Sequence, residues 1–162
     1  MAKWSKYPHD QKAITYAGDA LKKIWDALHK GDGESLPKEA ELQDAWRQFH
    51  AGNFAEAAAM GAGNTVAIKA TSIYATHIEK KEAAQVKLYQ DAMAMAAALI
   101  KSEPKNPNGH YQYAYAAGRY SQSISVMKAL KEGYGGQIKS ALEATLKLDP
   151  KHADAHTAMG AY

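Results

Sequence analysis

The fold is decided by the stretch Pro104-Lys105-Asn106-Pro107-Asn108-Gly109-His110, because its first two residues and its last recur forty-six residues later as Pro150-Lys151 and His156. Apolar residues at helical spacing precede both copies, at Val86, Tyr89, Met93, Ala96 and Ile100 and then at Ile138, Leu142, Thr145 and Leu146. A helix, a proline that stops it and a new helix, used twice, are typical of stacked helical hairpins. One hairpin cannot bury its apolar stripe alone, so we expect neighbouring hairpins to cover one another.

The composition is that of an ordinary folded protein. Hydrophobic residues make up 46% of the 162 residues and charged residues 23%, a balance that supports one domain over residues 1–162. Alanine dominates, and the β-branched and aromatic residues are too scattered for a sheet. We therefore predict an all-α fold in which well over half of the residues are helical.

Several classes of protein are disfavoured by composition alone. The chain has no cysteine, which excludes disulfides and thiolate chemistry. Its first residues contain no apolar run, and no later stretch is long enough to span a bilayer, so we expect a cytoplasmic protein without a membrane partner. The formal charge of +3 is mild and lies wholly in residues 101–162, which argues against a nucleic-acid partner.

The pattern predicts about nine helices joined by short linkers, so that consecutive helices are antiparallel neighbours. Their expected ranges are about 10–30, 37–51, 53–61, 64–78, 82–101, 108–118, 121–133, 137–148 and 153–162. Asn53 with Glu56 is typical of a capping box, and Gly118 is expected to end its helix. Trp25, Trp46 and Phe49 lie on apolar faces and are expected in the core of the N-terminal half, while Ile124, Met127 and Leu130 should face inward.

Two segments resemble the tetratricopeptide-repeat family. The pattern Ala153-x-x-His156-x-x-Met159-Gly160, directly after Leu148-Asp149-Pro150, resembles a junction between two such repeats. The segment Gly52-Asn53-Phe54-x-Glu56-Ala57 resembles the turn inside one repeat. The spacing of forty-six exceeds the family's repeat of about 34 residues, and an inserted helix from Arg119 to Glu132 fits the excess. The resemblance implies an array of antiparallel helical hairpins, with His156 at a packing position.

The last third resembles further helical proteins. Residues 104–162 are similar to the helical domain of regulators of microtubule dynamics and to the T component of tripartite ATP-independent transporters. The shared features are Asn106-Pro107-Asn108, Ala114, Gly118-Arg119 and Leu148-Asp149-Pro150. A group of bacterial cytoplasmic tetratricopeptide-like proteins is similar over residues 118–122 and 152–156. These resemblances imply a fold more than a function, because one scaffold holds unrelated ligands.

A run of tyrosines supplies the main candidate binding surface. On a helix, Tyr111 and Tyr115 share a face while Tyr113 lies on another, so at least one of them should line a groove or an interface. The candidate partner-binding residues are His110, Tyr111, Tyr113, Tyr115, Arg119, Tyr120, Lys128 and Lys131. The leading hypothesis is a protein-interaction scaffold that binds a peptide or partner helix, with the basic residues as a rim for an acidic peptide. The alternative is a small-molecule binding protein, which a pocket enclosed by His110, Tyr111 and Tyr115 would favour over an open groove.

Catalytic and metal chemistry find little support in the sequence. His152 and His156 have the i, i+4 spacing of helical zinc ligands, but no third ligand is identifiable. We therefore expect packing histidines, no metal and no cofactor. The glycine-rich segment 60–65 lacks the strand and lysine of a phosphate loop. No spacing is typical of a catalytic set, so we do not expect an enzyme.

The C-terminal helix is expected to end the array incompletely. Ala155, Met159 and Tyr162 can face the preceding helix, but no further helix follows to cover the other side. The repeat pattern therefore predicts a truncated last unit, with either self-association through this end or a frayed last helix.

Overall fold

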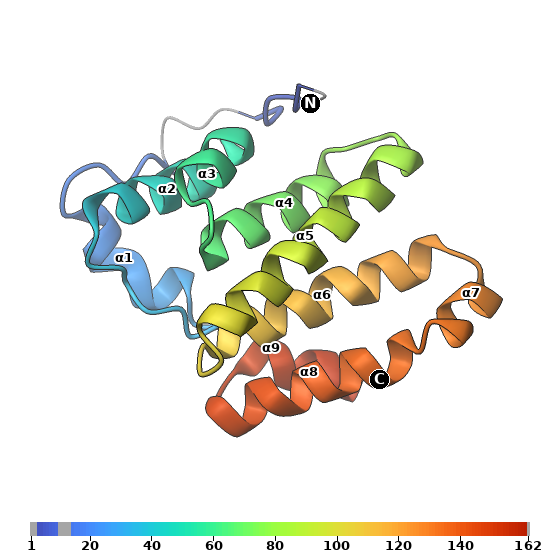
Figure 1. Ribbon diagram of the computed structural model, residues 1–162. Helices are drawn as coiled ribbons and strands as arrows, with labels where there is room; N and C mark the ends of the chain where they lie inside the picture. Colours follow the sequence, from blue (N-terminus) through green and yellow to red (C-terminus); the bar gives the residue numbers. More distant parts are fainter. Residues whose placement is uncertain (1–2, 10–13, 162) are drawn as a thin grey trace.

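The computed structural model describes residues 3–9 and 14–161, and this part of the chain is 70% helical, contains nine helices and has no strand (Figure 1). The prediction of an all-α protein with about nine helices is confirmed. The helices are α1 (Ala20–Leu28), α2 (Ala40–His50), α3 (Phe54–Met60), α4 (Thr65–His77), α5 (Glu82–Ser102), α6 (Pro107–Ser123), α7 (Val126–Lys131), α8 (Tyr134–Leu148) and α9 (Ala153–Gly160). Within the described ranges, every helix is too short or too polar to cross a lipid bilayer.

The helices stack as hairpins, with α4, α5, α6 and α8 side by side (Figure 1). From α2 to α6, each helix packs on the next one along the chain, and α4 also contacts both α2 and α6. Because α6 lies in the middle, it contacts α4, α5 and α8 at once. The core between these helices contains many alanines and a few large side chains, namely Ile68, Tyr89, Ala92, Met93, Ala96, Leu99, Ala116, Ala117 and Tyr120. Small residues let the helix axes approach closely.

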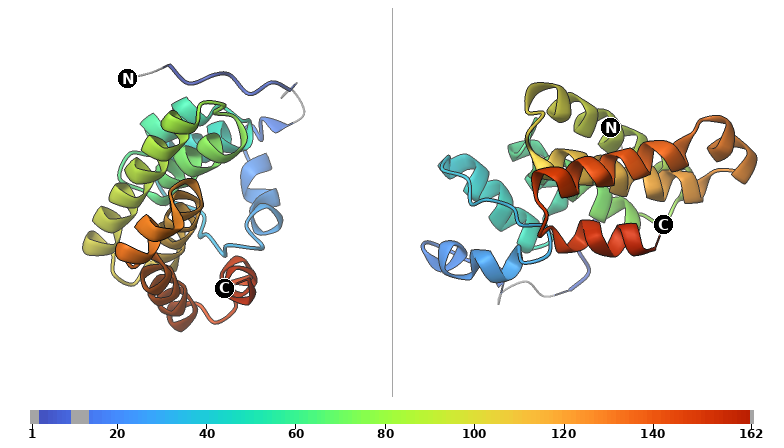
Figure 2. Two further views of the ribbon diagram at one scale, coloured as in Figure 1. Left: turned by 90° about the vertical axis from the view of Figure 1, so that its right-hand side faces the viewer. Right: turned by 90° about the horizontal axis from the view of Figure 1, so that it is seen from below.

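A second core holds the N-terminal half together. Trp25 and Trp46 are buried in it with their rings edge to face at 5.6 Å, and Phe49 packs against the same cluster. The prediction for these three aromatics is confirmed. The end of the chain returns to this half: Figure 2 shows α9 on the same side of the molecule as α1, with the loop after α1 between them. A hydrogen bond of 3.0 Å from the Asp154 amide to the Gly31 carbonyl joins the two.

The forty-six-residue repeat is also a structural repeat. Asn106 and His152 occupy the same position in the two copies, and the side chain of each caps the following helix by accepting backbone N–H groups. The later histidines also match, because His110 Nε2 and His156 Nε2 bond the carbonyl of their own copy's first proline at 2.9 and 2.8 Å. The two copies thus use the same local contacts to turn one helix into the next.

The first helix is shorter than predicted. It begins at Ala20 rather than near residue 10, and residues 10–13 of the prediction lie outside the described part. Tyr16 and Gly18 have φ angles of 45° and 56°, which a right-handed helix cannot contain. The Arg47 guanidinium holds this segment, because it donates to the carbonyls of Tyr16 and Gly18 at 3.0 and 2.8 Å.

Two predicted boundaries in the middle of the chain are also wrong. Gly118 lies within α6, which continues to Ser123, and the next helix begins only after its cap residue Ser125. The third helix does begin after Asn53, but the Asn53 side chain forms no capping bond, and its amide group donates to Gln48 at 2.7 Å. Finally, α8 begins at Tyr134, directly after Gly133 with its left-handed φ of 70°.

We predict that Trp46→Ala destabilises the fold by about 3–5 kcal/mol, because it removes a fully packed indole and leaves a cavity. Trp46 is only 2% exposed. The measurement is a urea titration of both proteins. Ile24→Ala, at a site 36% exposed, is the control and should change stability far less. Equal, small effects of the two substitutions would contradict a core role for Trp46.

Candidate functional site

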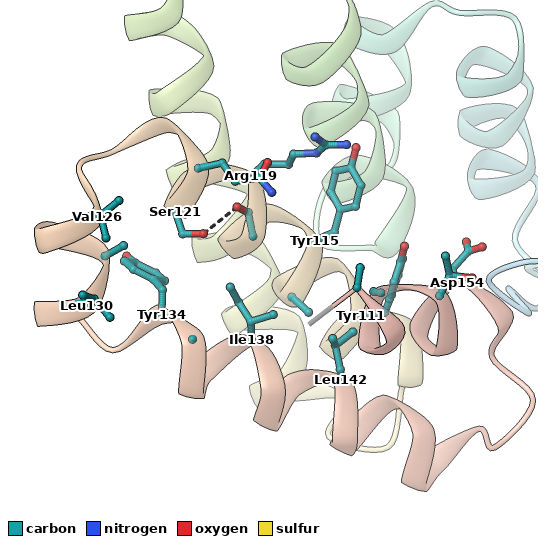
Figure 3. Close-up of a pocket in the computed structure, with 18 residues that line it drawn as sticks. Tyr111, Tyr115, Arg119, Ser121, Val126, Leu130, Tyr134, Ile138, Leu142 and Asp154 are labelled. Carbon is teal, nitrogen blue, oxygen red and sulfur yellow. Dashed lines mark hydrogen bonds between the residues drawn. The ribbon is translucent and has the colours of Figure 1, made fainter.

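A groove of about 700 Å³ lies between α6, α7, α8 and α9 (Figure 3). Its polar side consists of Tyr111, Tyr115 and Arg119, which succeed one another at every fourth residue of α6 and therefore share one face. The Arg119 guanidinium lies 5.5 Å from the centre of the Tyr115 ring, a distance typical of a cation–π contact. The structure thus brings together three of the predicted site residues.

The rest of the groove is mostly apolar. Tyr134, Ile138 and Leu142 of α8 form one side, and Figure 3 shows their side chains in a row along this helix. Small residues, among them Ala114, Gly118, Ala158 and Ala161, leave room between the helices. The result is an apolar channel with tyrosine hydroxyls and a guanidinium along one edge.

The other predicted site residues lie elsewhere. The Tyr113 hydroxyl donates to Gln137 at 2.7 Å, and Tyr120 is buried in the core beside α5. His110 bonds the Pro104 carbonyl and does not line the groove. Lys128 and Lys131 are exposed on α7 outside the lining. The predicted eight-residue surface is therefore reduced to Tyr111, Tyr115 and Arg119.

Two parts of the groove were not predicted. Met127 and Leu130 were expected to face inward, but they are 77% and 72% exposed, and so is Val126 at 75%. The prediction is wrong because α7 follows the end of the α5–α6 hairpin, where no described helix covers its apolar side. Val126 and Leu130 instead extend the groove lining. The lining residues at this end are Asp154, Thr157 and Ala158 of α9 and Ala161 directly after it, and their i, i+3 and i, i+4 spacings mark a shared face.

The charges at the groove lack partners within the described ranges. No carboxylate there lies within salt-bridge distance of Arg119, and no cation lies so close to Asp154. Tyr111 stays neutral, because burial and, to a lesser degree, the nearby Asp154 carboxylate raise the pKa of its hydroxyl. The lining of the groove therefore has one cation from α6, one anion from α9 and several tyrosines.

A cluster of buried and half-buried polar side chains lies beside α9 and connects it to the N-terminal half. We call it the buried network and define it as His29, Asp32, Glu34, His50, Thr65, Lys69, Asn108 and His152. Its first part is the Asp32 carboxylate, which bonds His29 Nδ1 at 2.9 Å and pairs with Lys69. Burial alone would raise the pKa of Asp32, but His29 and Lys69 hold it well below the usual range.

Glu34 is the second carboxyl of the network and behaves differently. Burial, helped by the negative charge of Asp32, raises the pKa of Glu34 to about 7, although hydrogen bonds from Thr65 and Asn108 oppose the rise. His50 Nε2 lies 3.1 Å from His29 Nε2, and burial lowers the pKa of His50 to about 4, with the charges of His29 and Lys69 acting in the same direction. No spacing in the sequence indicates this network, since its members come from five separate parts of the chain.

The histidines at 152 and 156 have structural roles. His152 Nε2 bonds Asn108 Oδ1 at 2.9 Å, and His152 Nδ1 accepts the Ala155 amide at 3.1 Å, so both ring nitrogens are engaged. Burial lowers the pKa of His152, which favours the neutral ring that these two bonds require. The assignment of His156 to a packing position is wrong, because His156 is exposed and His152 is the buried one. Among the described residues, no three His, Asp or Glu side chains are grouped as metal ligands.

Comparison with known proteins adds no relative, because no family model, no curated protein and no solved structure matches this chain.

We predict that His152→Ala destabilises the protein by about 2–4 kcal/mol, because it removes a helix cap and leaves the buried Asn108 amide oxygen without its donor. His156→Ala is the matched control. It removes one exposed hydrogen bond to the Pro150 carbonyl and should cost about 1 kcal/mol or less. Thermal and urea unfolding at pH 7 measure both, and equal losses would contradict the different roles of the two rings.

Proposed function

We propose that this protein is an interaction scaffold, and that the groove between α6 and α9 binds an amphipathic helix of a partner protein. The observation that carries the proposal is an apolar groove of about 700 Å³ with a tyrosine and arginine edge. Grooves between helices bind partner helices through a row of apolar anchors. The resemblance to bacterial cytoplasmic tetratricopeptide-like proteins supports a helical scaffold and a cytoplasmic location.

The shape of the lining favours a helix with large apolar side chains. Alanine and glycine positions on α6 and α9 leave space that leucine or phenylalanine anchors would fill. On α7, Val126 and Leu130 are exposed at the same groove, so a partner would bury them as well. Tyr111, Tyr115 and Tyr134 supply the rigid contact area that is enriched at protein interfaces.

The positive charge of Arg119 favours a partner helix that carries an acidic residue. Since Arg119 has no carboxylate partner among the described residues, an acidic residue on the partner would complement it. We therefore expect an amphipathic helix with an acidic residue beside its apolar stripe. A small-molecule ligand is less well supported, because His110 is outside the groove.

The test uses a displayed library of amphipathic helical peptides that vary in charge, followed by fluorescence anisotropy on selected binders. Gly118→Phe should weaken binding at least about tenfold, which corresponds to about 1.4 kcal/mol, because the new ring occupies the groove. A Cβ atom at Gly118 meets no neighbour within 4 Å, so the fold should tolerate the substitution, and circular dichroism checks this.

The matched control is Gly136→Phe. Gly136 is an exposed helical glycine with equally open surroundings, but it lies outside the groove lining. It should leave peptide binding unchanged. Failure of the library to yield any binder, or binders insensitive to Gly118→Phe, would contradict the proposed function.

Charge reversal tests the expected acidic partner. Arg119→Glu should weaken acidic peptides about tenfold and favour otherwise identical peptides that carry lysine, since the sign of the groove edge changes. Lys139→Glu is the control, because Lys139 is an exposed lysine of α8 outside the lining. Equal responses to the two substitutions would mean that net charge, rather than the groove, selects the peptide.

A further inference from the structure

Residues 3–9, which we call the N-terminal segment, form neither helix nor strand and contact α3 and α4 through their side chains. The Trp4 indole stacks on the Tyr74 ring of α4, with the ring centroids 4.3 Å apart and the planes at 10°. Tyr7 meets the Phe54 ring of α3 edge to face at 6.3 Å, and the Ser5 amide donates to the Tyr74 hydroxyl at 2.9 Å. Two aromatic side chains three positions apart and a backbone hydrogen bond therefore attach this segment to the helices.

The surface beneath the N-terminal segment is mostly apolar. We call it the aromatic face and define it as Phe54, Ile73, Tyr74, His77 and Ile78. Ile73 and His77 are four residues apart, as are Tyr74 and Ile78, so α4 and the residue after it present these four on one side. The Tyr74 ring selects an aromatic side chain for stacking, and its hydroxyl accepts a backbone N–H of any sequence. These two contacts suit an extended peptide.

The N-terminal segment does not fill the site in which it lies. Of its seven residues, only Trp4 and Tyr7 are half-buried, and the other five are exposed. A pocket of about 650 Å³ remains between the segment and the turn from α2 to α3. A second pocket, of about 420 Å³, lies where Tyr7 and His9 meet the aromatic face. Because side chains leave few such spaces in a closely packed interior, the segment is a loosely packed occupant of this surface.

We propose that the aromatic face is a second peptide-binding site, specific for an extended segment with two aromatic residues three positions apart, and that residues 3–9 occupy it until such a partner displaces them. The site is independent of the groove between α6 and α9, because Figure 2 shows the N-terminal segment and α9 at opposite ends of the molecule. A protein with both sites would bind two different peptides at once.

The charges at the aromatic face favour a neutral or basic partner. Among the described helix and turn residues that line the two pockets, Glu56 is the one carboxylate, and there is no lysine or arginine. The N-terminal segment fits this pattern, since it carries Lys3 and Lys6 and no acidic residue. An acidic peptide would meet only Glu56 and is disfavoured. The preference is thus opposite to that of the groove, where Arg119 favours an acidic helix.

The experiment measures fluorescence anisotropy of a labelled peptide with the sequence of residues 3–9, added to the full chain. In the wild type, the attached segment competes at a roughly millimolar effective concentration. Trp4→Ala/Ser5→Pro removes the stacked indole and the N–H donor while leaving the aromatic face unchanged. The peptide should therefore bind this double variant at least about tenfold more tightly than the wild type.

Two controls separate specific displacement from general effects. Lys6→Ala alters an exposed residue of the same segment and should leave peptide binding as in the wild type. A peptide in which alanine replaces both aromatic residues should bind the double variant at least about tenfold more weakly. Equal affinities of the wild type and the double variant would overturn the proposal, as would an absence of binding to the folded double variant at millimolar peptide.

NMR spectroscopy of the isotope-labelled wild type makes the test independent of how the variant folds. Unlabelled peptide at millimolar concentration should shift the Trp4 indole N–H signal, because Trp4 leaves the Tyr74 ring. The amide signals of Phe54 and Tyr74 should shift with it, while those of Tyr111 and Tyr115 in the groove stay unchanged. An unchanged Trp4 signal, or shifts confined to α6, would overturn the proposal. Neither outcome bears on helical peptides selected for the groove, which are tested through Gly118→Phe.

Discussion

The buried charge of Asp32 is the constraint on which the arrangement of the two halves depends. An isolated carboxylate in a protein interior is very unfavourable, so its partners must be in place whenever the chain is folded. Asp32 obtains them from His29 and from Lys69 of α4, and its own backbone carbonyl accepts a hydrogen bond from Asn108 of α6. Apolar contacts alone would let α1 slide on its neighbours, whereas these directional bonds specify one position.

The central helix α6 explains how one protein has both a tight core and an open groove. One face of α6 carries Ala116, Ala117 and Tyr120 into the core. The opposite face carries Tyr111, Tyr115 and Arg119 into the groove. Alanines let both α5 and α8 approach α6 closely, while the face with the two tyrosines and Arg119 borders the groove. The distribution of small and large side chains around this one helix thus places a tight core and an open groove side by side.

Sequence reasoning succeeded where local pattern decides the structure and failed where distant partners do. The all-α fold, the buried Trp25 and Trp46 and the shared face of Tyr111 and Tyr115 all follow from helical periodicity. The end of α6 could not be predicted in this way, because a glycine such as Gly118 is tolerated wherever packing holds the helix. The buried network could not be predicted from the sequence for a similar reason. Its bonds join residues up to seventy-six positions apart, and no spacing rule connects them.

The position of α9 couples the network to the groove. This helix is capped by His152, a member of the network, and it contributes Asp154 and Ala158 to the groove lining. Asn108 bonds both His152 and the loop after α1, so the N-terminal half helps to position this wall of the groove. The groove therefore depends on the whole fold rather than on the C-terminal hairpins alone.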